Sequence, residues 1–262
     1  MPFDFSNVFS QNAIMRVAVS GQVLYALWDG AALIAYNGSP FANGGLSGRK
    51  LDVRKVAVLS PCEPSKIPAI GLNYHEHARE MNKPAPEEPL LFMKPASSVI
   101  GFGSPVIMPA LSRRIDFEGE LGIVMGKACR AVTESEALDF VMGYTCLNDI
   151  TARDLQAKDG QYTRAKCFDT FCPIGPAIAL DVEPGNLKIK TTLNGKLFQD
   201  SSTFDMIFSI EQMVAYVSSV MTLNPGDVIA TGTPSGISTM QAGDTVCVEL
   251  EGIGRLINPL TK

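Results

Sequence analysis

Short apolar runs separated by glycine, proline and asparagine recur along the chain and constrain its fold more than any other feature. From residue 67 onward, six runs have the length and composition of strands: 67–72, 89–93, 121–125, 143–147, 188–193 and 245–250. Asn194-Gly195 follows one of them and favours a type I′ hairpin, whose two central residues take positive φ. The pattern predicts a strand-rich α+β protein.

The first 60 residues form a separate pattern. Apolar runs at 14–19, 23–28 and 31–36 alternate with turn residues, and a Gly- and Ser-rich stretch follows at 37–48. Chains longer than roughly 250 residues tend to divide into domains. We therefore predict a small β-rich N-terminal domain, residues 1–60, and a main domain, residues 61–262.

Two helices are predicted from capping boxes, in which the first residue and the fourth cap each other's backbone. Thr133 with Glu136 precedes an apolar segment at 137–142, and Ser209 with Gln212 precedes another at 213–221.

Charge and composition restrict the partners and the compartment. The chain carries 22 Lys and Arg against 27 Asp and Glu, a balance that disfavours binding to nucleic acid. No run reaches the roughly 18 apolar residues of a membrane span. The six cysteines are scattered without a C-x-x-C pair, as expected of buried apolar residues in a reducing compartment. We expect a cytoplasmic protein without nucleic-acid or membrane partners.

Common nucleotide and nucleophile motifs are absent from the sequence. There is no Walker loop, and Gly101-Phe102-Gly103 lacks the third glycine of a dinucleotide fingerprint. Gly232-Thr233-Pro234-Ser235-Gly236 does not fit the Gly-x-Ser-x-Gly elbow of serine hydrolases.

Two glutamates, Glu118 and Glu120, come just before and at the start of an apolar strand. Side chains two residues apart in a strand share a face and lie about 7 Å apart along it, so both could reach one cation. The alternative is a solvated strand face, because Glu249 and Glu251 have the same spacing.

A third acid, Asp149, stands where another apolar strand ends and a helix begins. It is either a metal ligand or an N-cap of that helix. Three carboxylates without a cysteine or histidine would suit Mg²⁺ or Mn²⁺ rather than zinc.

Both histidines of the chain, His75 and His77, lie in one short segment. In a helix, His77 and Glu80 would share a face and form an oriented general base. The alternatives are two histidines exposed on a polar helix, or a pair that flanks a metal from a strand.

Taken in order, these segments resemble the fumarylacetoacetate hydrolase family over about residues 67–262, in particular its acylpyruvase-like and 2-hydroxyhepta-2,4-diene-1,7-dioate isomerase-like members. The resemblance rests on six stretches: Gly71-Leu72-Asn73-Tyr74 with His77 and Glu80, Phe92-Met93-Lys94-Pro95, Asp116-Phe117-Glu118-Gly119-Glu120-Leu121, residues 148–156, Lys166-Cys167-Phe168-Asp169-Thr170, and residues 226–236.

The resemblance implies a role for each matching residue. Glu118, Glu120 and Asp149 would bind the metal, and His77 with Glu80 would activate water on a lid, residues 74–90. Lys166 would take part in catalysis, and the positions that match substrate contacts are Arg153, Gln156, Thr233 and Lys94. Some relatives have a basic residue where this chain has Leu72. The implied fold is a mixed β-roll, and the implied assembly is a homodimer.

The reaction expected from this resemblance is metal-dependent hydrolysis of a C–C bond in an acylpyruvate, such as fumarylpyruvate or acetylpyruvate, with release of pyruvate. Decarboxylation or tautomerisation of oxaloacetate, and a 2-hydroxymuconate-type isomerisation, are alternatives at the same site. A non-catalytic metal- or ligand-binding protein is the alternative of another class.

Overall fold

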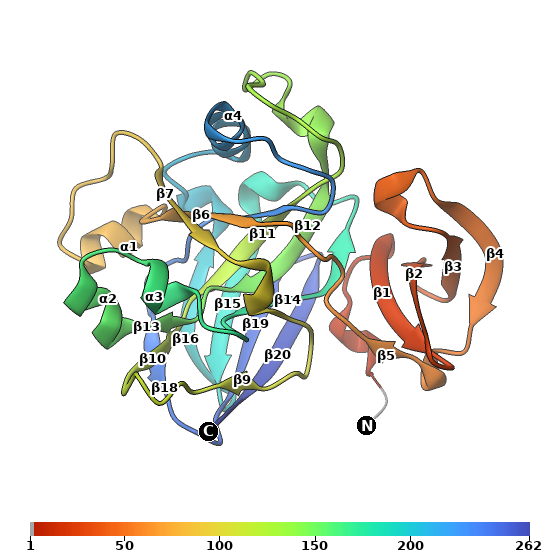
Figure 1. Ribbon diagram of the computed structural model, residues 1–262, viewed down its shortest axis with the longest axis horizontal. Helices are drawn as coiled ribbons and strands as arrows, with labels where there is room; N and C mark the ends of the chain where they lie inside the picture. Colours follow the sequence, from red (N-terminus) through yellow and green to blue (C-terminus); the bar gives the residue numbers. More distant parts are fainter. Residues whose placement is uncertain (1–2) are drawn as a thin grey trace.

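The computed structural model describes residues 3–262, whose strands form three sheets (Figure 1). The largest has 12 strands, and β5 (Ala57–Val58) and β8 (Val99–Ile100) pair with it beside the main path. Along that path the order is β4 (Gly45–Leu51), β3 (Leu33–Asn37), β2 (Gln22–Trp28), β1 (Ala13–Val19), β14 (Cys172–Ala179), β12 (Val141–Asn148), β11 (Gly119–Met125), β17 (Val228–Ala230), β6 (Ile67–Gly71) and β7 (Leu90–Lys94).

Two smaller sheets pack with the large one. The five-stranded sheet has the order β16 (Lys196–Ser202), β15 (Lys188–Leu193), β19 (Thr245–Leu250), β20 (Gly254–Thr261) and β9 (Val106–Ile107). The three-stranded sheet consists of β13 (Thr151–Ala152), β10 (Ile115–Phe117) and β18 (Ser238–Met240). Leu121, Ile189 and Val248 share one apolar cluster, so the two larger sheets enclose a common core. Parallel and antiparallel pairs occur together, which confirms the predicted strand-rich α+β fold and its mixed roll.

The six predicted strands of the main part correspond to β6, β7, β11, β12, β15 and β19. The predicted hairpin is also present between β15 and β16, where Leu193 pairs with Lys196. Asn194 has φ 51° and Gly195 has φ 78°, as a type I′ turn requires.

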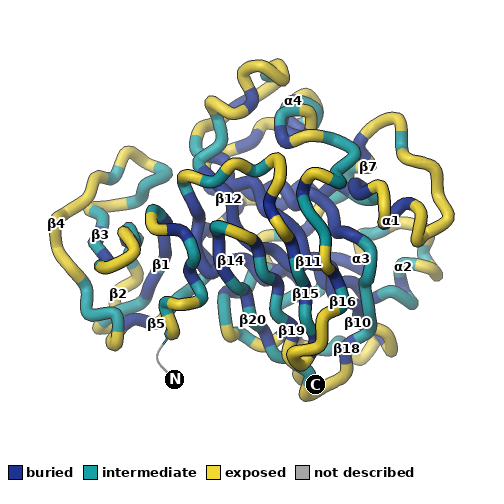
Figure 2. The backbone as a smooth tube through the Cα atoms, turned by 180° about the vertical axis from the view of Figure 1, so that it is seen from behind, coloured by how far each residue is buried: buried dark blue, intermediate teal, exposed yellow. Residues whose placement is uncertain are grey.

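The N-terminal strands β1 to β4 continue the large sheet instead of forming a closed sheet of their own. They join it where Ala13 and Ile14 of β1 pair with Ala179 and Ile178 of β14. Figure 1 shows these strands as a lobe beside the main body, and Figure 2 shows that more of their backbone is exposed. The domain boundary at residue 60 stays a prediction, and residues 1 and 2 of that domain lie outside the described part.

Four α-helices are present in residues 3–262: α1 (His75–Glu80), α2 (Arg153–Asp159), α3 (Thr163–Lys166) and α4 (Ile210–Val220). Ser209 and Gln212 form the predicted reciprocal capping box of α4. Short 3-10 helices span Phe5–Asn7, Pro40–Ala42, Val53–Lys55, Ala96–Ser98, Ala137–Phe140, Pro184–Asn186 and Thr203–Asp205. None of the described helices is long and apolar enough to cross a membrane.

The helix predicted at 137–142 was wrong in kind and length. A 3-10 helix spans Ala137–Phe140, and Val141 already begins β12. The Glu136 carboxylate accepts from the Thr133 N–H at 3.0 Å, but no side chain caps the backbone in return. Pairing of Val141 with Met125 in β11 requires extended backbone, which ends the helical segment early.

The expectation that all six cysteines are buried holds for four of them. Cys62, Cys129, Cys146 and Cys172 are buried, whereas Cys167 and Cys247 are half-buried, and all six are free.

Candidate active site

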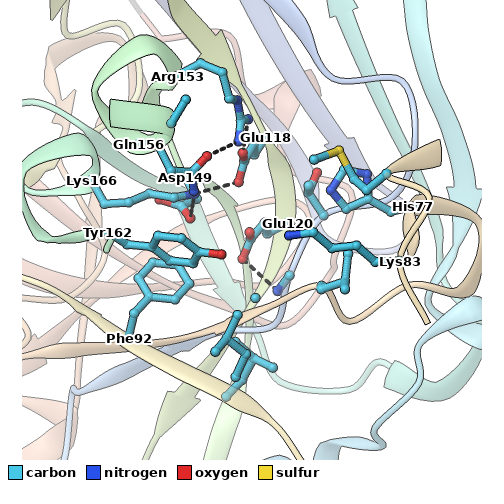
Figure 3. Close-up of a pocket in the computed structure, with 18 of the residues that line it drawn as sticks. His77, Lys83, Phe92, Glu118, Glu120, Asp149, Arg153, Gln156, Tyr162 and Lys166 are labelled. Atoms are coloured by element: carbon cyan, nitrogen blue, oxygen red, sulfur yellow. Dashed lines mark hydrogen bonds and ion pairs between the residues drawn. The ribbon is translucent and has the colours of Figure 1, made fainter. Parts of the chain in front are cut away.

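A cavity of about 370 Å³ opens between α1, β7, β11 and the α2–α3 region (Figure 3). Eight of the ten residues proposed for the site line it: His77, Glu118, Glu120, Asp149, Arg153, Gln156, Lys166 and Thr233. The other two, Glu80 and Lys94, each contact one of these residues from outside the cavity wall.

The three acidic residues converge because β11 begins beside the end of its antiparallel neighbour β12. Glu118 joins β10 to β11, Glu120 lies in β11, and Asp149 follows β12. The Asp149 N–H donates to the Glu118 carbonyl at 2.9 Å, and one carboxylate oxygen from each acid lies within 4.8 Å of the others. Helix α2 begins only at Arg153 with Ala152 as its N-cap, so the alternative of Asp149 as its cap was wrong.

Gly119 allows the two glutamates to stand this close to the second sheet. A Cβ atom at this position would lie 2.1 Å from Thr191 Oγ1, so a larger residue would push the strands apart. Gly232 has φ +93° and its N–H donates to Glu120 Oε2 at 2.9 Å. The hydrogen bond from Gly232 holds the Glu120 carboxylate in place.

Three cations surround the acidic cluster. Lys166 Nζ lies 2.7 Å from Glu118 Oε2 and 2.5 Å from Asp149 Oδ2, and Arg153 also pairs with Glu118. Lys94 Nζ lies 2.5 Å from Asp149 Oδ1 and donates to the Lys166 carbonyl at 2.7 Å. The fully buried Lys94 therefore stands behind Asp149, where it orients a carboxylate and does not face the cavity.

The two glutamates differ in their electrostatic environment. Burial alone would raise the pKa of Glu118, but Lys166 and Arg153 outweigh it and hold this pKa below its usual value. Burial, Asp149 and Glu118 together raise the pKa of Glu120 well above its usual value. A bound dication would remove the repulsion at Glu120, and the all-oxygen donor set suits Mg²⁺ or Mn²⁺. The residues present therefore fit the expected metal.

His77 and Glu80 share one face of α1, as expected from their spacing. His77 Nδ1 lies 2.8 Å from Glu80 Oε2, and the other Glu80 oxygen accepts from the Gly236 N–H at 3.0 Å. His77 is buried and lines the cavity, so for this residue the exposed alternative was wrong. His75 is exposed and outside the cavity, which leaves no His75–His77 pair to flank a metal.

Gln156 and Thr233, the remaining polar residues of the site, form some of their hydrogen bonds within the protein. Arg153 Nη1 donates to Gln156 Oε1 at 2.6 Å, which leaves the Gln156 amide N–H groups for a ligand. The Thr233 hydroxyl donates to the Gly119 carbonyl and accepts from Gln199, both at 2.8 Å. Its hydroxyl proton is therefore committed to the protein.

Sequence reasoning missed several residues at the site. The fully buried Asp116 accepts from Arg153 Nε at 3.0 Å and from Thr239 at 2.8 Å, so it fixes the guanidinium. It begins the Asp-Phe-Glu-Gly-Glu motif, which was the available signal. Lys83, Phe92 and Tyr162 also line the cavity. Phe92 belongs to the matching stretch Phe92-Met93-Lys94-Pro95, whereas nothing in the local sequence marks Lys83 or Tyr162.

Comparison with known proteins places this geometry in context. Residues 66–261 match the family model described as fumarylacetoacetate (FAA) hydrolase C-terminal. A curated relative from Xenopus laevis, named oxaloacetate tautomerase fahd2, mitochondrial, is 43% identical over 218 residues, which are 78% of this chain and 68% of the relative.

Two solved structures resemble the whole arrangement. The 2-hydroxyhepta-2,4-diene-1,7-dioate isomerase of Mycobacterium marinum has a TM-score of 0.89 and 38% identity, over 95% of this chain and 99% of that one. The maleylpyruvate hydrolase of a Sphingobium species, in complex with manganese(II) and pyruvate, has a TM-score of 0.77 and 28% identity, over 95% of this chain and 98% of that one.

Proposed function

Because the chain belongs to the fumarylacetoacetate hydrolase family, we propose that it is a divalent-metal-dependent enzyme acting on a small 2-oxo or 2-enol carboxylic acid. One observation carries the proposal: three buried carboxylates and the His77–Glu80 pair meet at the same cavity. A non-catalytic metal-binding protein would have no use for an oriented histidine beside that cluster.

Glu118, Glu120 and Asp149 would hold Mg²⁺ or Mn²⁺, and the bound dication would supply Lewis-acid stabilisation of negative charge on a 2-oxo group. Lys166 and Arg153 lie beside the carboxylates and offset their charge. They favour approach of an anionic substrate, whose carboxylate the three acidic side chains alone would repel. The manganese complex of the Sphingobium enzyme supports the choice of metal.

The His77 imidazole would move the proton. Its Nδ1 atom donates to the Glu80 carboxylate in the tautomer that this contact favours, which leaves Nε2 as the base. Glu80 would stabilise the imidazolium that forms, while its bond to Gly236 holds the pair against the cavity wall. Nε2 would take a proton from C3 of the substrate and return it to the oxygen of the resulting enolate.

Keto–enol tautomerisation is the simplest reaction for this machinery, since it needs only that proton transfer. The 43% identity to a protein named oxaloacetate tautomerase supports it. Hydrolysis of an acylpyruvate is the second candidate. There Nε2 would deprotonate a water that attacks the distal carbonyl at C4, and the C3–C4 bond would break to release the acyl part as a carboxylic acid. The electron pair would stay on the pyruvate enolate, which would take the proton back at C3. The likeness to maleylpyruvate hydrolase over 95% of the chain favours this alternative.

A substrate panel tests the proposal. The purified protein would be assayed with Mg²⁺ or Mn²⁺ on oxaloacetate, fumarylpyruvate and acetylpyruvate, with and without a chelator. Loss of enol absorbance measures tautomerisation, and released pyruvate measures cleavage. We expect chelator-sensitive turnover that falls about 100-fold or more in His77→Ala, as for loss of a general base.

The outcomes separate the alternatives. Interconversion of oxaloacetate tautomers without pyruvate supports the tautomerase, and pyruvate from an acylpyruvate supports the hydrolase. Bound metal without turnover of any substrate would instead support the binding protein. The homodimer also stays a prediction, which light scattering on the same sample would test.

A further inference from the structure

Lys83 is a cation at the cavity without a partner of its own. Its side chain lines the cavity, and Figure 3 shows it on the same side as His77, across from Tyr162 and Phe92. Within residues 3–262 it makes no ion pair, whereas Lys166 and Arg153 at the same cavity are both paired. Lys83 therefore offers a positive charge that the protein leaves available.

The backbone fixes Lys83 relative to the base. Helix α1 ends in a Schellman motif in which Asn82 takes the left-handed conformation, with φ 53°. The Asn82 N–H donates to the Arg79 carbonyl at 3.0 Å, and the Lys83 N–H donates to the Ala78 carbonyl at 2.9 Å. Lys83 is thus the last residue of the helical unit that carries His77, and its backbone is held to that helix.

The charges deeper in the cavity are already balanced. Four carboxylates, from Asp116, Glu118, Glu120 and Asp149, lie among four cations, from Lys94, Arg114, Arg153 and Lys166. A bound dication and Lys83 would therefore give the cavity a net positive charge. A ligand with two carboxylates would neutralise more of the added charge than a ligand with one.

The wall near Lys83 is apolar. Leu72, Met81 and Leu90 line the cavity, and Met81 and Leu90 are 39% and 45% exposed at its mouth. A ligand whose 2-oxo acid end lies at the acidic cluster would share the cavity with these apolar side chains and with Lys83. Leu72 itself carries no charge and cannot bind a distal carboxylate.

We infer that Lys83 selects the substrate by binding a second, distal carboxylate, so that the preferred substrates are 2-oxo or 2-enol dicarboxylates. The inference rests on the proposed function and makes it more specific. It ranks oxaloacetate and fumarylpyruvate above acetylpyruvate, which has no distal carboxylate.

A pair of matched ligands isolates this contact. 2-Oxoglutarate and 2-oxopentanoate differ only by a carboxylate in place of a methyl group, and calorimetry with Mg²⁺ present measures the affinity for each. The variants are Lys83→Met, Lys83→Arg and Lys83→Glu. Lys50→Met is the matched control, because Lys50 is an exposed lysine of β4 and does not line the cavity.

We expect the wild-type protein and Lys50→Met to prefer 2-oxoglutarate, and Lys83→Met to lose about 10-fold of that preference, as for one charge-assisted contact. Lys83→Arg should keep most of the preference, and Lys83→Glu should reverse it. An unchanged ratio in Lys83→Met would overturn the inference while leaving the proposed function intact. If wild-type protein binds neither 2-oxo acid, the inference fails together with the proposed function.

Discussion

Two pairs of glutamates in this protein have the same spacing and opposite surroundings. Glu118 and Glu120 are 6% and 2% exposed and meet Asp149 at a cavity. Glu249 is half-buried and forms an ion pair with Arg255. Glu251 is exposed, and its carboxylate accepts a hydrogen bond from the Lys188 N–H. Spacing along a strand therefore does not make a metal site.

The difference comes from what lies beyond each strand. β11 runs between β12 and β17, and the loops after β12 and β17 bring Asp149 and Gly232 against its first residues. β19 runs between β15 and β20, whose turns leave Glu251 in solvent. Other segments bury Glu118 and Glu120 and bring Asp149 beside them. The carboxylates then repel one another, and a bound cation would relieve that repulsion.

Neutralising both glutamates of each pair tests most directly whether only the buried pair binds a metal. The double variant Glu118→Gln/Glu120→Gln should lose metal binding and more than about 1000-fold of activity, because several kcal/mol of charge stabilisation disappear with the metal. Glu249→Gln/Glu251→Gln should keep both within about twofold, as is usual for surface substitutions. Calorimetric Mn²⁺ titration and turnover of the best substrate measure the two effects, and equal losses in the two variants would contradict the comparison.

The cations around each pair provide a second contrast, in stability. Lys166→Met leaves Glu118 and Asp149 buried with less compensation, and it should lower the free energy of unfolding of metal-free protein by about 3–5 kcal/mol. Arg255→Met removes the exposed partner of Glu249 and should cost less than about 1 kcal/mol.

Urea unfolding of both variants measures this contrast. Added Mn²⁺ should restore part of the stability of Lys166→Met, since a dication can compensate the same carboxylates, and it should not change the difference between Arg255→Met and wild type. If Lys166→Met lowered the free energy of unfolding as little as Arg255→Met does, repulsion among the buried carboxylates would not destabilise the metal-free protein.

The sequence predicted the strands because they leave local signals. Alternating apolar runs and Asn194-Gly195 depend on neighbours within the segment, so β6, β15 and the β15–β16 hairpin could be placed. The helix predicted at 137–142 was wrong because pairing of Val141 across β11 decides the backbone there, and that partner is distant in sequence.

Convergence of side chains could not be predicted in the same way. The family resemblance grouped Glu118, Glu120 and Asp149, whereas local sequence alone favoured Asp149 as a helix cap. The position of Lys94 behind Asp149 depends on a contact between segments that are far apart in the chain. Asp116 was missed because its partners, Arg153 and Thr239, come from α2 and β18.

Substitution of Asp116 should have the smallest effect on activity. It extends the comparison of the two glutamate pairs to the arginines that pair with acidic residues in each region. Asp116 and Glu249 each pair with an arginine, but Asp116 is fully buried and its arginine also contacts Glu118. Asp116→Asn keeps the shape and removes the charge, so Arg153 should lose its fixed orientation. We expect KM to rise about 10-fold with a smaller change in kcat, in the range for residues that orient a ligand-binding group.

Arg114→Met is the matched control for this variant, because it removes the other, exposed cation on Asp116 and leaves the Arg153 contact in place. Steady-state kinetics of both variants, with Asp116→Glu as a test of rescue, separate orientation from folding. A variant that only destabilises the fold would lower the active fraction and hence kcat without raising KM. If Asp116→Asn behaved in that way, its carboxylate would support the β10–β18 pairing, and Arg153 would be held well enough by Glu118 and Gln156 alone.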